Sequence, residues 1–98
     1  MLSLTVKLNY TILKLMDELF QRLDRAEKHI AQVKNKVARR DLLKMVKAID
    51  QAIVAADMES VECRRMHRES IRYRELVKTV DSLLINLEQH ITFASLIG

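Results

Sequence analysis

The sequence predicts an all-α protein, either a small antiparallel helical bundle or a long helical hairpin, with two to three helices. Three observations predict this fold class. The 98 residues include no proline and one glycine, Gly98, so the residues that tight turns favour are nearly missing. Apolar residues recur at alternating steps of four and three, which is the spacing of helices packed side by side. A chain this short buries a modest fraction of its surface, so we expect dimerisation to complete the core.

We expect a single domain over residues 1–98, with helices at about 9–37, 42–56 and 60–96. The opening segment fits two periods. Apolar and polar residues alternate from Leu2 to Tyr10, as in a half-buried strand. Leu4 and Leu8 also lie on one helical face, with Ser3 as a possible N-cap. Because no other segment resembles a strand that could pair with it, we favour the helix.

The first clear helix has one apolar seam in a constant phase. Its residues are Ile12, Met16, Leu19, Leu23, Ala26, Ile30, Val33 and Val37. On other faces of this helix, Glu18 precedes Arg22 and Asp24 precedes Lys28 by four residues, the favourable orientation for exposed ion pairs. We assign the seam to helix packing and oligomerisation.

The middle of the chain starts a new apolar stripe after the first seam fails between Ala38 and Asp41. The stripe contains Leu42, Met45, Ile49, Ala52 and Ala56, with Val46 and Ile53 beside it. Asp41 could cap a second helix after a turn, or one helix could run through with a shifted seam. Periodicity stops again before Ser60, and both Asp57 and Ser60 are suitable N-caps. We therefore predict a turn near Asp57 and antiparallel helices on either side of it.

The last predicted helix has two different halves. Its second half carries a seam for packing and oligomerisation, formed by Tyr73, Val77, Val80, Leu84, Leu87 and Ile91. In its first half, five arginines lie between Arg64 and Arg74, and the apolar seam loses its register. We expect this half to project beyond its partner helix or to kink near Ser70.

Two groups of basic residues are the most informative polar feature. The first comprises Lys36, Arg40, Lys44 and Lys47, and the second comprises Arg64, Arg65, Arg68, Arg72 and Arg74. If the chain turns near Asp57, residues 44–47 lie roughly opposite 67–72, and the two groups form one basic patch. Such a patch would bind phosphates or an acidic partner, since guanidinium groups make bidentate contacts with both. The alternative is an ordinary solvated surface, because acidic residues are interspersed.

Other site chemistry is not indicated. Glu59, Cys63 and His67 share a helical face at spacings of four, but structural zinc generally needs four ligands, so we predict no metal. Cys63 is the only cysteine, which suits a reducing compartment. We expect no cofactor, no small-molecule substrate and no enzymatic activity, since no phosphate-binding loop or nucleophile motif is present. With no signal peptide and no apolar run of membrane-spanning length, we expect a cytoplasmic protein that does not enter membranes.

Two hypotheses of function follow from these patterns. The first is a non-enzymatic interaction or adaptor protein that forms a homodimer and binds a protein partner through apolar helix faces. The second is a nucleic-acid-binding protein that places its basic patch on the phosphate backbone. The steep salt dependence of phosphate contacts would distinguish the second from the first.

Overall fold

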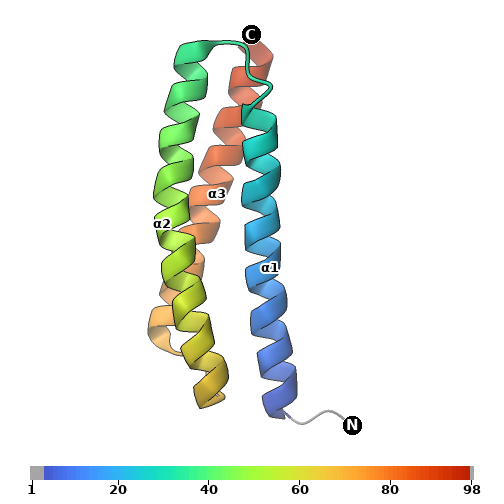
Figure 1. The fold of residues 1–98 in the computed structure, drawn as a ribbon, viewed down its shortest axis with the longest axis vertical. Helices are drawn as coiled ribbons and strands as arrows, with labels where there is room; N and C mark the ends of the chain where they lie inside the picture. Colours follow the sequence, from blue (N-terminus) through green and yellow to red (C-terminus); the bar gives the residue numbers. More distant parts are fainter. Residues whose placement is uncertain (1–3, 98) are drawn as a thin grey trace.

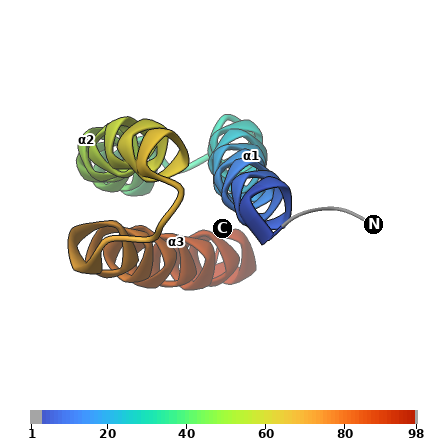
Figure 2. The same ribbon diagram turned by 90° about the horizontal axis from the view of Figure 1, so that it is seen from below.

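The structure, a computed structural model, describes residues 4–97 as three helices, with no strand among those residues. The helices are α1 (Leu4–Ile30), α2 (Lys36–Met66) and α3 (Ile71–Ile97). The antiparallel helices α1 and α2 lie side by side, and α3 passes behind them (Figure 1). Seen along the bundle, α3 covers one side of the α1–α2 pair (Figure 2). The predicted all-α bundle is confirmed in its three-helix form.

The core combines the seams predicted for the first and last helices with the buried row of α2, all packed against each other within one chain. From α1 it takes Ile12, Met16, Leu19, Leu23, Ala26 and Ile30, and from α3 it takes Tyr73, Val80, Leu84, Leu87, Ile91 and Ala94. Val77 is half-buried against this core. Apart from Val37, the seam side chains are thus buried or half-buried by their own chain.

The first helix starts earlier than predicted and ends earlier as well. It begins at Leu4, so the helical reading holds for the described part of the opening segment, while Leu2 and Ser3 lie outside the described residues. It ends at Ile30, where the amides of Gln32 and Val33 donate to the carbonyls of His29 and Ile30 at 3.0 Å. The predicted end near residue 37 is therefore wrong.

The first turn depends on an asparagine that the sequence reading did not use. The Asn35 side chain caps α2 by accepting a hydrogen bond from the Ala38 amide at 3.0 Å. Val33 is buried from within the turn, whereas Val37 is 65% exposed on the first turn of α2. The four-three spacing of apolar residues thus continues through Val33 and Val37 although the chain is not helical between Ile30 and Lys36.

The predicted turn near Asp57 is also wrong, because α2 runs unbroken from Lys36 to Met66. Ser60 faces the core, and its hydroxyl donates to the Asp57 carbonyl at 2.6 Å instead of capping a helix. The buried row of α2 continues through Ala56, Ser60 and Cys63 at the four-three spacing. Since these side chains are small, the row no longer looked like an apolar seam.

The real reversal between the second and third helices lies at residues 67–70, inside the arginine-rich segment. His67 adopts the left-handed conformation (φ 56°, ψ 35°), and the amide of Arg68 donates to the Cys63 carbonyl at 3.1 Å. Ser70 caps α3 by accepting from the Tyr73 amide at 3.0 Å. The seam therefore loses its register between residues 64 and 74 because the chain turns there, and the single helix predicted for 60–96 does not exist.

One ion-pair network ties α1 to α3. Arg22 binds Asp81 at 2.7 Å and Glu88 at 2.8 Å, with 23% of its side chain exposed. These hydrogen bonds, first to Glu88 and then to Asp81, raise the pKa of Arg22. The predicted pairing with Glu18 is not formed, whereas Lys28 pairs with Asp24 at 3.2 Å as expected.

Candidate functional site

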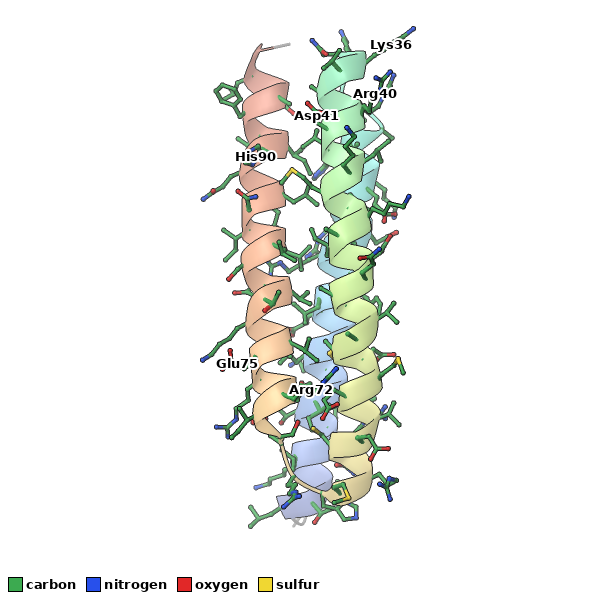
Figure 3. All side chains as sticks on the ribbon, turned by 90° about the vertical axis from the view of Figure 1, so that its left-hand side faces the viewer. Lys36, Arg40, Asp41, Arg72, Glu75 and His90 are labelled. Carbon is green, nitrogen blue, oxygen red and sulfur yellow. The ribbon has the colours of Figure 1, made fainter. Side chains whose placement is uncertain are left out.

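The two basic groups lie at opposite ends of the bundle. Lys36, Arg40, Lys44 and Lys47 occupy the first turns of α2, whereas Arg64 and Arg65 occupy its last turn. Figure 3 shows Lys36 and Arg40 at one end and Arg72 toward the other. About 25 Å of helix separates Lys47 from Arg64, at roughly 1.5 Å per residue. The prediction of one merged patch is wrong, because it depended on a turn near Asp57.

Most of the arginines near the second turn are paired with carboxylates. Arg65 binds Glu62 at 2.8 Å, Arg72 lies 3.6 Å from Glu59, and Arg74 binds Glu69 at 2.9 Å. The hydrogen bond from Arg65 lowers the pKa of the Glu62 carboxyl group. These pairs reduce the net positive charge of the segment.

The carboxylate of Glu59 also has a structural partner in this turn. It accepts a hydrogen bond from the Ser70 hydroxyl at 2.9 Å, while the Ser70 amide donates to the buried Cys63 sulfur at 3.4 Å. Ser70, Glu59 and Cys63 thus hold the start of α3 against the end of α2. His67 has left the helical face that it was predicted to share with Glu59 and Cys63. Within residues 4–97, no three His, Cys, Asp or Glu side chains are grouped to hold a metal ion.

A surface that the sequence reading missed lies on α1 and α2, on the side away from α3. On α1, residues that precede core positions by one face α3, as Arg22 does through its ion pairs. On α2, Glu59 holds the equivalent position and contacts Ser70 and Arg72 at the start of α3. Residues that follow core positions by one must therefore face the other side, because each step turns the helix by about 100°. We call this side the outer face, and Figure 1 shows it toward the viewer.

The outer face carries large apolar side chains that are in contact with water. Six of them form what we call the outer patch: Tyr10, Leu13 and Phe20 from α1, and Val54, Met58 and Val61 from α2. Each is at least 40% exposed, and Met58 is 68% exposed. Four of them follow core positions by one, whereas Tyr10 and Met58 lie two residues from the nearest core position and point further away from the core. Asp17 and Asp57 also follow core positions by one, so two carboxylates lie among these apolar side chains. Exposed apolar side chains gathered on one side of a protein mark interaction sites in soluble proteins.

Charged residues border the outer patch at both ends. At one end lie Glu27 on α1 and Asp50 on α2, and neither forms an ion pair within the described part of the chain. Partial burial, followed by repulsion from Asp50 and Asp24, raises the pKa of Glu27. At the other end, Arg64 is half-buried and its Nε has no hydrogen-bond partner. The patch is thus bordered by unpaired negative charge at one end and an unpaired guanidinium at the other.

The sequence contained a signal for this surface. At Leu13, Phe20, Val54 and Val61 the residue directly after a core position is apolar, so the apolar stripe is wider than one seam. Such width indicates a helix that contacts more than one neighbour.

No protein family, no curated protein and no solved structure matches this chain. Among the described helices, none combines the length and the apolar character needed to cross a membrane. The three histidines are exposed, and the His90 ring lies 2.7 Å from the Asn86 carbonyl.

Proposed function

We propose that this protein is a non-enzymatic interaction or adaptor protein that binds another polypeptide through the outer patch. One observation carries the proposal: six large apolar side chains from two adjacent helices are exposed together on one side of the bundle. Tyrosine and methionine, which supply Tyr10 and Met58 here, are enriched in protein interfaces. On the outer side of α3, by contrast, exposed apolar residues such as Ile85 and Phe93 lie along a single helix.

The patch suits a helical or flat protein surface. It extends along two adjacent antiparallel helices, and charged residues lie at both of its ends, as in interfaces with an apolar centre and a polar rim. The residues of the predicted seams are not part of it, because they are buried in the core. We therefore assign partner binding to the outer patch instead of to the seams.

Site-specific photo-cross-linking in the cells that produce the protein tests this proposal. A benzophenone amino acid in place of Met58 should yield a covalent adduct with a polypeptide, and Leu13→Glu should abolish that adduct. The same probe in place of Ser82, an exposed position on α3, is the matched control and should yield none. Equal labelling from both positions, or an adduct that is insensitive to Leu13→Glu, would contradict the proposal.

Nucleic-acid binding is a second candidate function, now through the basic residues at the start of α2 alone. Lys36, Arg40, Lys44 and Lys47 form no ion pair with the described residues, so all four are free to contact phosphates. Four contacts predict that log K falls with log salt at a slope of about −3 to −4. Fluorescence anisotropy with a labelled duplex measures that slope. No binding at low salt, or binding that survives Arg40→Glu with Lys44→Glu, would remove this candidate.

A further inference from the structure

We propose that the outer patch binds a second copy of this chain in an antiparallel two-fold dimer, with Arg64 of each copy against Glu27 and Asp50 of the other. This inference rests on the proposed function and names its partner. Three observations support this dimer independently: the shape of the bundle, the order of residues along α2, and the unpaired charges of the outer face.

The shape of the bundle leaves one broad side uncovered. Its principal extents are 51 × 25 × 15 Å, and α3 covers one of the two broad sides (Figure 2). The other broad side, formed by α1 and α2, offers on the order of 1,000 Å², compared with the roughly 800 Å² per partner that a standard interface buries. A second copy therefore fits on this side.

The order of residues along α2 is self-complementary in the antiparallel orientation. Along the outer face, Asp50 is followed by three apolar residues, Val54, Met58 and Val61, and then by Arg64. A two-fold axis near Asp57, midway between Asp50 and Arg64, places each arginine opposite the other copy's aspartate and the apolar residues opposite each other. The symmetry forms each such contact twice. A parallel arrangement would place like charges together.

The charges that this dimer brings together lack partners within one chain. Arg64 forms no ion pair, and its Nε is buried without a hydrogen-bond partner. Glu27 and Asp50 repel each other across α1 and α2, and they are joined in that repulsion by Asp24. The accessible part of a guanidinium from the second copy would relieve this repulsion.

Other charges lie near the same contact, Asp17 among them. Lys47 approaches the other copy's Arg65, whose charge Glu62 already neutralises within its own chain at 2.8 Å. The two Asp57 carboxylates, each half-buried within its own chain, lie near the axis. Like charges near a two-fold axis repel each other and weaken a dimer. Removing the Asp57 charge should therefore strengthen dimerisation, whereas the other substitutions weaken it.

Sedimentation velocity over a range of concentrations tests the interface directly. The wild-type chain should sediment as a dimer that dissociates on dilution. Leu13→Glu should weaken dimerisation by about 30-fold or more, because it places a charge in the apolar centre. Ile85→Glu on α3 is the matched control, since Ile85 is 45% exposed and Leu13 is 49% exposed, and it should leave dimerisation unchanged.

Charge variants test the orientation. Arg64→Glu should weaken dimerisation about tenfold, and adding Asp50→Arg should restore most of the affinity. Asp57→Asn should tighten the dimer about twofold, a gain that misfolding cannot produce. Lys78→Glu, an exposed position on α3, should change nothing.

Two results would overturn the inference. A chain that stays monomeric up to about 100 µM, well above a typical dissociation constant, has no such dimer. A dimer that Leu13→Glu does not weaken uses another surface. In either case, a Met58 photo-adduct with a different protein would leave the proposed function standing, whereas the absence of any such adduct would remove both.

Discussion

Tyr73 and Arg22 are polar residues held in an apolar bundle, and their environments lead to predictions about single residues. Tyr73 is 2% exposed at the first turn of α3, and its hydroxyl has no hydrogen-bond partner in residues 4–97. Burial, with smaller contributions from Glu69 and Cys63, raises the pKa of Tyr73 to about 12. Arg22 is fixed between Asp81 and Glu88. Tyr73 can therefore be used to test the packing of α3, and Arg22 can be used to test the contact between α1 and α3.

Alkaline titration of Tyr10→Phe, which leaves Tyr73 as the single tyrosine, should give a midpoint near pH 12 by absorbance at 295 nm. The unfolded chain releases this proton near its ordinary value of 10, so the folded state binds more protons between pH 10 and 12. The free energy of unfolding should therefore fall as pH rises through this window. A midpoint near 10 in a folded protein would show that Tyr73 is not buried.

Arg22→Ala should lower the free energy of unfolding by about 1 kcal/mol, because it removes a two-carboxylate contact whose partners are about half exposed. Arg25→Ala, an exposed arginine three residues away without an ion pair, is the control and should change it by less than about 0.5 kcal/mol. Urea unfolding measures both values. Equal effects of the two substitutions would show that Arg22 does not join α1 to α3.

The three helices are separated by turns that use His67, Asn35 and Ser70 in place of glycine or proline. His67 adopts a left-handed conformation that glycine adopts more readily. Asn35 and Ser70 accept hydrogen bonds from the first turns of α2 and α3. Each turn therefore depends on one or two side chains.

Glycine substitutions distinguish the observed turn from the one predicted at Asp57. His67→Gly should raise the free energy of unfolding by up to about 1 kcal/mol, because glycine removes the strain of a positive φ. Asp57→Gly should lower it by about 0.5–1 kcal/mol, because residue 57 lies inside α2. Thermal or urea unfolding of both variants gives the comparison. The opposite signs would place the turn at Asp57.

The N-cap of α3 leads to a separate prediction. Ser70→Ala should lower the free energy of unfolding by about 1–2 kcal/mol, since the hydroxyl accepts from Tyr73 and donates to Glu59. Ser82→Ala, on an exposed part of α3, should change it by less than about 0.5 kcal/mol. If the two variants were equally stable, the cap would contribute nothing.

Sequence reasoning predicted the helical class and the core, because four-three spacing records directly which side of a helix is buried. It failed at the turns for a physical reason. Ala56, Ser60 and Cys63 extend the buried row of α2 without looking apolar, and His67 takes a conformation that its residue type does not announce. It also missed the outer patch, since residues such as Val54 can belong to a wide core stripe or to a second surface. Whether such a residue lies in the core or on an exposed surface depends on which side of α1 and α2 the third helix covers.

As a whole, the molecule is a flat bundle with one broad side covered by α3 and the other formed by α1 and α2 (Figure 2). The covered side contains the Arg22 network and the contacts of Glu59 with the start of α3. The uncovered side contains the outer patch between unpaired acidic and basic residues. A second layer of helices on that side would bury the patch, as layered domains bury their apolar faces. We propose that a second copy supplies this layer.

Disulfide trapping next to the two-fold axis tests most directly whether a second copy binds to the outer face. In a Cys63→Ser background, Met58→Cys lies one residue from the proposed axis, and a disulfide forms only where two Cα atoms come within about 7 Å. Mild oxidation at low protein concentration should convert most of this variant into a covalent dimer of two 11.4 kDa chains. Ile85→Cys in the same background should remain largely monomeric. Trapping that is equal at the two positions, or stronger at residue 85, would contradict the antiparallel dimer through the outer face.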